Sequence, residues 1–184
     1  VDALLKELSV AVSAEDIGCG GAPVRIHLYS CIQHGKKMHP DFDRALLGIL
    51  SRDDKAKILL NDGSKNMLIR RWIENWEISA DVIKERVLFI PRVDHPDYLR
   101  LLSLSSVFLN PFPFGSGITS SDAISVCIPL VLLPRRTSVL PFALAQVRAL
   151  GPSFEALFVA DSVEDYIERA VTLASESHSP GGAQ

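Results

Sequence analysis

The stretch before one predicted helix combines a permissive backbone, hydroxyl groups and a carboxylate. The residues concerned are Gly115, Ser116, Gly117, Thr119, Ser120 and Asp122. Glycines beside a helix start let backbone N–H groups meet an anion, which the helix dipole also attracts. Asp122 would repel a phosphate, but acidic residues accept hydrogen bonds from ribose hydroxyls in dinucleotide folds. The pattern therefore indicates a nucleotide site.

The same spacing also has a structural explanation, which the local pattern leaves open. Thr119 and Asp122 fit a capping box, in which two side chains satisfy N–H groups at a helix start. The stretch is neither the G-x-G-x-x-G of dehydrogenases nor a phosphate loop, since no lysine follows the glycines. Its interpretation depends on the elements around it.

Six short apolar runs and the helical spacings between them must position these residues. The runs occupy residues 24–32, 56–60, 86–90, 106–109, 130–133 and 157–159. Each is too short for a buried helix, so each predicts a strand covered on both faces. Helical periodicity lies between and after them, at 40–50, 67–76, 98–104, 119–127, 139–150 and 162–174. The alternation predicts an α/β fold with a doubly wound, mostly parallel, Rossmann-like sheet of about six strands.

We expect this domain to occupy residues 24–176. A linker or partly ordered segment is expected at 1–23 and a disordered tail at 177–184. Ligands of open α/β sheets bind beyond the carboxyl ends of the strands, so we expect ligand-binding residues in the turns that follow strands. Asp53 and Asp54 lie at the other kind of turn, between a helix and a strand, where we expect solvated side chains.

Composition excludes several classes of protein. The 184 residues carry a net charge of −3, which offers no basic surface for nucleic acid. No apolar run approaches the roughly 20 residues that span a membrane, and the N-terminus has no secretory-signal pattern. Cys19, Cys31 and Cys127 lack paired spacing and indicate a reducing, cytoplasmic compartment. The histidines and cysteines have no metal-ligand spacing, so we expect no metal site.

Four stretches in order, at residues 29–43, 89–99, 109–134 and 137–141, resemble the O-GlcNAc transferase-like glycosyltransferases, the SPINDLY and SEC family. Residues 109–134 resemble the family's Asp-Pro-Phe strand end, its Thr-Ser-x-acidic helix start and its Gly-Thr-Pro-Val-Val strand. Residues 29–43 match its Gln, Lys and His-Pro-Asp-Phe-Asp pattern. Residues 89–99 match its loop after the third strand, and residues 137–141 and 164–166 also fit. The resemblance covers about residues 24–174.

The resemblance implies one half of a GT-B glycosyltransferase, in which two Rossmann-like domains face each other across a cleft. This chain would be the donor-binding half of an enzyme that transfers N-acetylglucosamine or another hexose from a UDP-sugar to Ser or Thr of proteins. It implies no cofactor and no metal. The other catalytic half, acceptor-binding domains and tetratricopeptide repeats would lie upstream, and the protein would be cytoplasmic or nuclear. We expect the chain alone to be inactive.

The family's roles carry over to individual residues of this sequence. Lys37 would be the catalytic residue, contacting the diphosphate and supporting the departing UDP. The implied UDP-sugar contacts are Gln33, Arg92, Val93, His95, Phe114, Gly115, Ser116, Gly117, Thr119, Ser120 and Asp122. Within this set the residues at 92–95 would hold uracil, those at 117–120 the diphosphate and Asp122 the ribose. Lys37 as a surface lysine, and His95 as an ordinary His-Pro turn residue, are the alternatives.

The sequence also departs from the family pattern. Asn110 replaces the usual Asp, and Ser116 and Cys127 replace the usual Gly. Two other hypotheses therefore stay open. The chain could be the donor domain of another GT-B enzyme, although the paired glutamates of the retaining enzymes are absent near Asp122. It could also be a degenerate Rossmann domain that serves as a non-catalytic interaction module.

Overall fold

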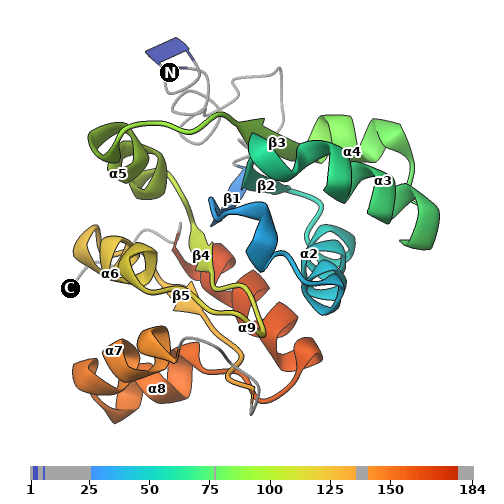
Figure 1. Ribbon diagram of the computed structural model, residues 1–184. Coiled ribbons are helices and arrows are strands. Elements are labelled where there is room, and N and C mark those ends of the chain that lie inside the picture. Colours follow the sequence, from blue (N-terminus) through green and yellow to red (C-terminus); the bar gives the residue numbers. More distant parts are fainter. Residues whose placement is uncertain (1, 4–5, 7–25, 77, 136–140, 178–184) are drawn as a thin grey trace, which may run out of the picture.

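Five parallel strands form the centre of the fold (Figure 1). This computed structural model describes residues 2–3, 6, 26–76, 78–135 and 141–177. The strands are β1 (His27–Cys31), β2 (Ala56–Asn61), β3 (Val87–Ile90), β4 (Val107–Leu109) and β5 (Leu130–Val131). Their order in the sheet is β3-β2-β1-β4-β5, and every pairing is parallel. The prediction of a doubly wound, parallel α/β fold is confirmed.

The predicted sixth strand, at 157–159, is not a strand in the described part of the chain. Helix α8 (Pro152–Phe158) takes most of that run, and Val159 forms only a single parallel bridge to Leu132. Pro152 stands in the first turn of the helix, where its fixed backbone favours helix initiation. A short apolar run cannot by itself distinguish a strand from the last turn of a helix.

The remaining elements connect the strands in the expected alternation. They are the 3₁₀ turns η1 (Gly35–Lys37) and η2 (Asp62–Ser64), and the helices α2 (Pro40–Arg52), α3 (Lys65–Trp76), α4 (Ala80–Arg86), α5 (His95–Ser103), α6 (Ile118–Ser125), α7 (Phe142–Leu150) and α9 (Val163–Glu176). The side chains of His39, Ser79, Asp94 and Ser162 cap the starts of α2, α4, α5 and α9. Helix α4 was not predicted. The proposed segments at 1–23 and 177–184 lie almost wholly outside the described residues.

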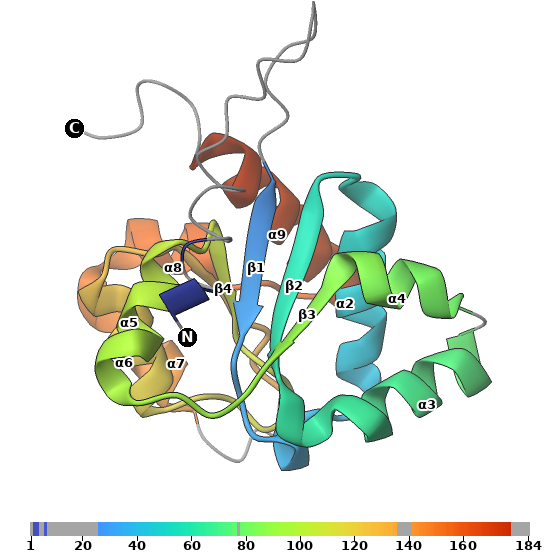
Figure 2. The same cartoon turned by 90° about the horizontal axis from the view of Figure 1, so that it is seen from above.

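Side chains alternate between two apolar layers along the central strands. Tyr29 and Ile58 belong to the larger core, together with residues of α2 and α9. Those two helices lie together behind the sheet in Figure 2. Leu28 and Leu59 point to the other face and pack with Leu101 of α5 in a smaller cluster. Burial on both faces explains why the strands read as continuous apolar runs.

A buried carboxylate, Asp53, links β1 to the turn before β2 at the amino ends of the strands. The Tyr29 hydroxyl donates to Asp53 Oδ2 at 2.6 Å, His27 Nδ1 lies 2.7 Å from the same oxygen, and the backbone N–H of Lys55 donates to Oδ1 at 3.0 Å. Burial acts to raise the pKa of Asp53, but the hydrogen bonds from His27 and Tyr29 outweigh it and hold the pKa below its ordinary value. Asp53 is only 6% exposed, so the expectation of a solvated side chain is wrong.

Candidate functional site

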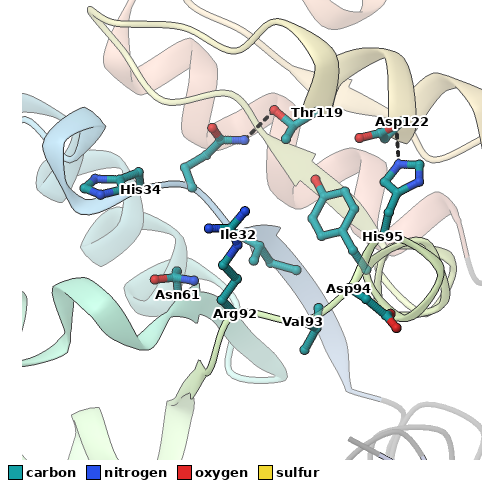
Figure 3. A pocket seen from close by; sticks show the side chains of 11 residues that line it. Ile32, His34, Asn61, Arg92, Val93, Asp94, His95, Thr119 and Asp122 are labelled. Atoms are coloured by element: carbon teal, nitrogen blue, oxygen red, sulfur yellow. Dashed lines mark hydrogen bonds and ion pairs between the residues drawn. The ribbon is translucent and has the colours of Figure 1, made fainter.

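An open cleft lies at the carboxyl ends of β1 to β4, at the opposite end of the sheet from Asp53 (Figure 3). Its volume is about 810 Å³. It is lined by the turns after β1 and β3, the last residue of β2 and the starts of α5 and α6, through Ile32, Gln33, His34, Asn61, Arg92, Val93, Asp94, His95, Tyr98, Thr119 and Asp122. Open α/β sheets bind ligands at this edge, where the strand order reverses. Here the reversal falls between β1 and β4.

Six predicted site residues come together in this cleft. They are Gln33, Arg92, Val93, His95, Thr119 and Asp122. Lys37, Phe114, Gly115, Ser116, Gly117 and Ser120 do not line it. The assignment of donor contacts to all of these residues stays a prediction. The two groups differ in whether their side chains reach the cleft.

A hydrogen-bonded chain crosses the reversal point. Lys37 Nζ donates to Gln33 Oε1 at 2.8 Å, and Gln33 Nε2 donates to Thr119 Oγ1 at 2.5 Å. Gln33 is only 4% exposed, so these two bonds fix its amide. Lys37 Nζ also lies 5.2 Å from the centre of the Phe114 ring, within cation–π range. Lys37 is thereby held beside Gln33 at the edge of the cleft, and burial lowers its pKa.

The loop that carries Lys37 is held by close packing against the loop after β2. A side-chain Cβ at Gly35 would lie only 2.7 Å from Cβ of Ser64, closer than two carbons can approach. The His34 side chain caps η1 by accepting a hydrogen bond from the N–H of Lys36 at 3.2 Å. Glycine at position 35 is therefore needed for the two loops to meet.

A second anchor holds the far end of this loop. Arg71 of α3 forms a two-pronged ion pair with Asp43 of α2, with both N–O distances 2.6 Å. Arg71 Nη1 also donates to the carbonyl of Met38 at 3.0 Å, one residue after Lys37. Asp43 is fully buried, so this paired charge is costly to break. The position of the lysine is thus fixed from both sides.

The amino end of α6 opens beside the chain described above. The helix begins at Ile118 with Gly117 as the N-cap residue, and no side chain caps it. A capping box would require Thr119 at the N-cap, so that alternative is wrong. Thr119 instead lies in the first turn and reaches the cleft. The uncapped first turn supplies N–H groups and a positive dipole end, which suits an anion.

Ser116 and Ser120 face the protein interior. Asn110 Oδ1 accepts hydrogen bonds from the backbone N–H of Ser116 at 2.8 Å and from its Oγ at 2.5 Å. Ser120 Oγ lies 2.6 Å from both Gly117 O and Gln146 Oε1. Asn110 and Ser116, two departures from the family pattern, are therefore hydrogen-bonded partners. Together they shape the loop rather than line the cleft.

The same loop is tied to the last helix. The Tyr166 hydroxyl of α9 donates to the backbone carbonyl of Asn110 at 3.1 Å. The rings of Tyr166 and Phe112 meet edge to face at 5.3 Å, and Phe42 of α2 packs against both. A buried aromatic group thus supports the strand end from which the loop departs.

The other end of the cleft is formed by the β3–α5 connection. His95 is the first residue of α5, and its Nε2 lies 3.1 Å from Asp122 Oδ1 of α6, as Figure 3 shows. Asp94 caps α5 by accepting from the N–H of Asp97 at 3.0 Å. The Arg92 side chain points into the cleft from the loop before it. His95 and Asp122 come from distant parts of the sequence, and both predicted roles place them near one nucleoside.

The predicted site set omitted four polar lining residues, His34, Asn61, Asp94 and Tyr98. Asn61 ends β2, so the rule that ligands lie beyond strand ends could have identified it. Tyr98 was placed in a predicted helix, where an aromatic residue is typical of the core. No local signal distinguishes a core tyrosine from one that borders a cleft.

Among the described residues, no group of three His, Cys, Asp or Glu side chains could hold a metal ion. No helix in the described ranges is both long and apolar enough to cross a membrane. Whether donor binding is independent of metal stays a prediction.

Comparison with known proteins bears on the fold. No protein-family model and no curated protein matches the chain. Among solved structures, an O-GlcNAc transferase mutant of Thermobaculum terrenum matches with a TM-score of 0.67 at 18% identity, covering 93% of this chain and 32% of that chain. A trehalose-6-phosphate synthase matches with a TM-score of 0.48 at 12% identity, covering 96% of this chain and 42% of that chain.

The similarity to the O-GlcNAc transferase concerns the fold alone. This chain spans about a third of the length of that O-GlcNAc transferase. The five-stranded parallel sheet and its flanking helices agree with the Rossmann-like half that the resemblance implied. The chain has a glycosyltransferase-like α/β fold.

Proposed function

We propose that this chain is the nucleotide-sugar-binding half of a glycosyltransferase that uses a UDP-sugar. The observation that carries the proposal is the hydrogen-bonded chain from Lys37 through Gln33 to Thr119, beside the uncapped start of α6. This arrangement places an ammonium group and helix N–H groups at one edge of a large cleft. A diphosphate is the ligand group that uses both.

The leaving group of sugar transfer explains why a lysine belongs there. When the bond between the sugar carbon and the phosphate oxygen breaks, negative charge builds up on the departing UDP. In this proposal Lys37 and the first turn of α6 would stabilise that charge, and both are oriented before the reaction begins. Stabilisation by these groups would make a metal ion unnecessary, as the resemblance also implies.

The nucleoside would occupy the β3–α5 end of the cleft. Arg92, Val93 and His95 would surround uracil, and the Asp122 carboxylate would accept hydrogen bonds from the ribose. His95 Nε2 is hydrogen bonded to Asp122 Oδ1 at 3.1 Å. We expect the imidazole to reorient when the base enters.

The rest of the reaction depends on parts of the protein beyond this domain. We propose that N-acetylglucosamine or another hexose passes to Ser or Thr of a protein, held by a second Rossmann-like half. Correct orientation of two reactants can lower a barrier by roughly 7 to 11 kcal/mol, and half a cleft cannot supply it. The isolated chain should therefore bind donor but transfer nothing.

Calorimetry with UDP, ADP and uridine tests the proposal directly. We expect UDP to bind more tightly than either, with no change when a chelator removes divalent metal ions. Incubation with UDP-N-acetylglucosamine and acceptor peptides should leave the peptides unmodified. Equal or tighter binding of ADP would refute the assignment of the cleft, and failure to bind any nucleotide would favour a non-catalytic interaction module.

A further inference from the structure

The hydroxyl of Tyr98 is buried against the cleft without a hydrogen-bond partner. Tyr98 is 8% exposed and lines the cleft, and its hydroxyl oxygen has no partner among the described residues. Two other buried polar atoms share this lack, Ser30 Oγ and Trp72 Nε1, but neither residue lines the cleft. An unmade buried hydrogen bond costs about 1 to 3 kcal/mol, so a hydroxyl retained there requires an explanation.

The surroundings keep this hydroxyl in place and protonated. The Tyr98 ring stacks on His95, three residues earlier in α5, with the centroids 6.3 Å apart and the planes 20° from parallel. Burial raises the pKa of Tyr98, and the negative charge of nearby Asp122 raises it further. At neutral pH the hydroxyl is therefore a fixed hydrogen-bond donor close to an acceptor, the Asp122 carboxylate.

A donor and an acceptor that line the same cleft select a chemical group that can reach both. An ionised carboxylate only accepts, and the Tyr98 hydroxyl needs something to accept its proton. A phosphate oxygen would meet repulsion from Asp122, and uracil would need two of its atoms, a carbonyl for Tyr98 and the N3–H for Asp122. A ligand hydroxyl satisfies both, because it accepts from Tyr98 and donates to Asp122.

We infer that Tyr98 and Asp122 together recognise a ribose hydroxyl of the bound nucleotide, with Tyr98 as the donor and Asp122 as the acceptor. This inference rests on the proposed function, since it assumes that a nucleoside diphosphate occupies the cleft. With Tyr98, the site would distinguish a nucleotide that has this hydroxyl from one that lacks it more strongly than Asp122 alone would. A site built to hydrogen-bond a hydroxyl disfavours the analogue without it, because its own buried polar groups are then left unpaired.

Tyr98→Phe tests the inference because it removes only the hydroxyl. Since that group has no partner in the free chain, the melting temperature should stay constant or rise. The affinity for UDP should fall about 3- to 12-fold, which corresponds to the net value of one hydrogen bond. The matched control is Tyr29→Phe, whose hydroxyl bonds Asp53 at the other end of the sheet. That control should lower the melting temperature and leave UDP affinity unchanged.

Two modified nucleotides, 2′-deoxy-UDP and 3′-deoxy-UDP, identify the contacted group. One of them should bind the unmodified chain less tightly than UDP, and Tyr98→Phe should weaken its binding no further. Unchanged UDP affinity in Tyr98→Phe would overturn the inference. So would an equal loss for UDP and both deoxynucleotides, because the hydroxyl would then contact something other than ribose. If the unmodified chain bound no UDP, the proposed function would fail first, and this inference with it.

Discussion

Replacement of Lys37 by alanine tests the diphosphate site most directly. The substitution removes the ammonium group from the edge of the cleft and leaves Gln33 Oε1 without the donor that lies 2.8 Å from it. Lys36, the preceding residue, is exposed and provides a matched control with the same charge. The two variants have the same net charge, so any difference between them reflects position.

The expected magnitude follows from the kind of bond. A charge-assisted hydrogen bond contributes about 1.5 to 3 kcal/mol, so Lys37→Ala should weaken UDP about 10- to 150-fold. Uridine has no phosphate, and its affinity should change less than about 2-fold. Loss of a partner for the buried Gln33 amide should lower the free energy of unfolding by about 1 kcal/mol.

Calorimetric titration of both variants with UDP and with uridine provides the measurement. The pH dependence adds a second test. Because burial lowers the pKa of Lys37, the ammonium loses its proton at a lower pH than an exposed lysine would. UDP affinity should therefore fall as the pH rises through that pKa, and Lys37→Ala should abolish this dependence. Equal losses for UDP and uridine, or equal effects of Lys36→Ala and Lys37→Ala, would refute a diphosphate role.

Three further predictions concern stability. Cys127 has φ 57°, where a side chain is strained, so Cys127→Gly should stabilise the fold by roughly 0.5 to 1 kcal/mol in chemical denaturation. Asp53→Asn should lower the free energy of unfolding by about 1 to 3 kcal/mol at pH 7. Because the native pKa of Asp53 is lowered, this loss of stability should shrink as the pH falls below about 4. An unchanged loss at pH 3 would contradict the ionised role of Asp53. Gly35→Ala should reduce both melting temperature and UDP affinity, and the added change Ser64→Gly should restore part of each, because it removes the Cβ that the new methyl group would meet.

The alternation of apolar runs and helical spacings was sufficient to predict the architecture. Burial on both faces gives the strands of a parallel sheet an unbroken apolar sequence. Four of the five strands fall within predicted runs, and β2 extends beyond its run by one residue, Asn61. The prediction of a strand at 157–159 was wrong because these residues also fit the last turn of α8, which Pro152 initiates. Periodicity over three residues carries too little information to decide between the two.

The site was predictable where a residue's place in the chain fixes its place in the fold. Gln33 and Thr119 follow strands that are neighbours in the sheet, so the rule about carboxyl ends brings them together. Whether a side chain then faces the cleft or the interior depends on loop geometry. Ser116 turns inward because Asn110 offers it an acceptor. Tyr98 and Asp53 were misjudged because their environments come from residues far away in the sequence.

Asn110 connects the loop beside the cleft to α9, a helix that does not line the cleft. Its side chain holds the loop before α6, while its backbone carbonyl holds the Tyr166 hydroxyl of α9. An anion that immobilises the first turn of α6 should restrict this loop and, through Asn110, slow the local opening of α9. Amide hydrogen exchange would detect the coupling as added protection around Tyr166 when UDP is present, far from any atom of the nucleotide. The last helix would then report on whether the cleft is occupied.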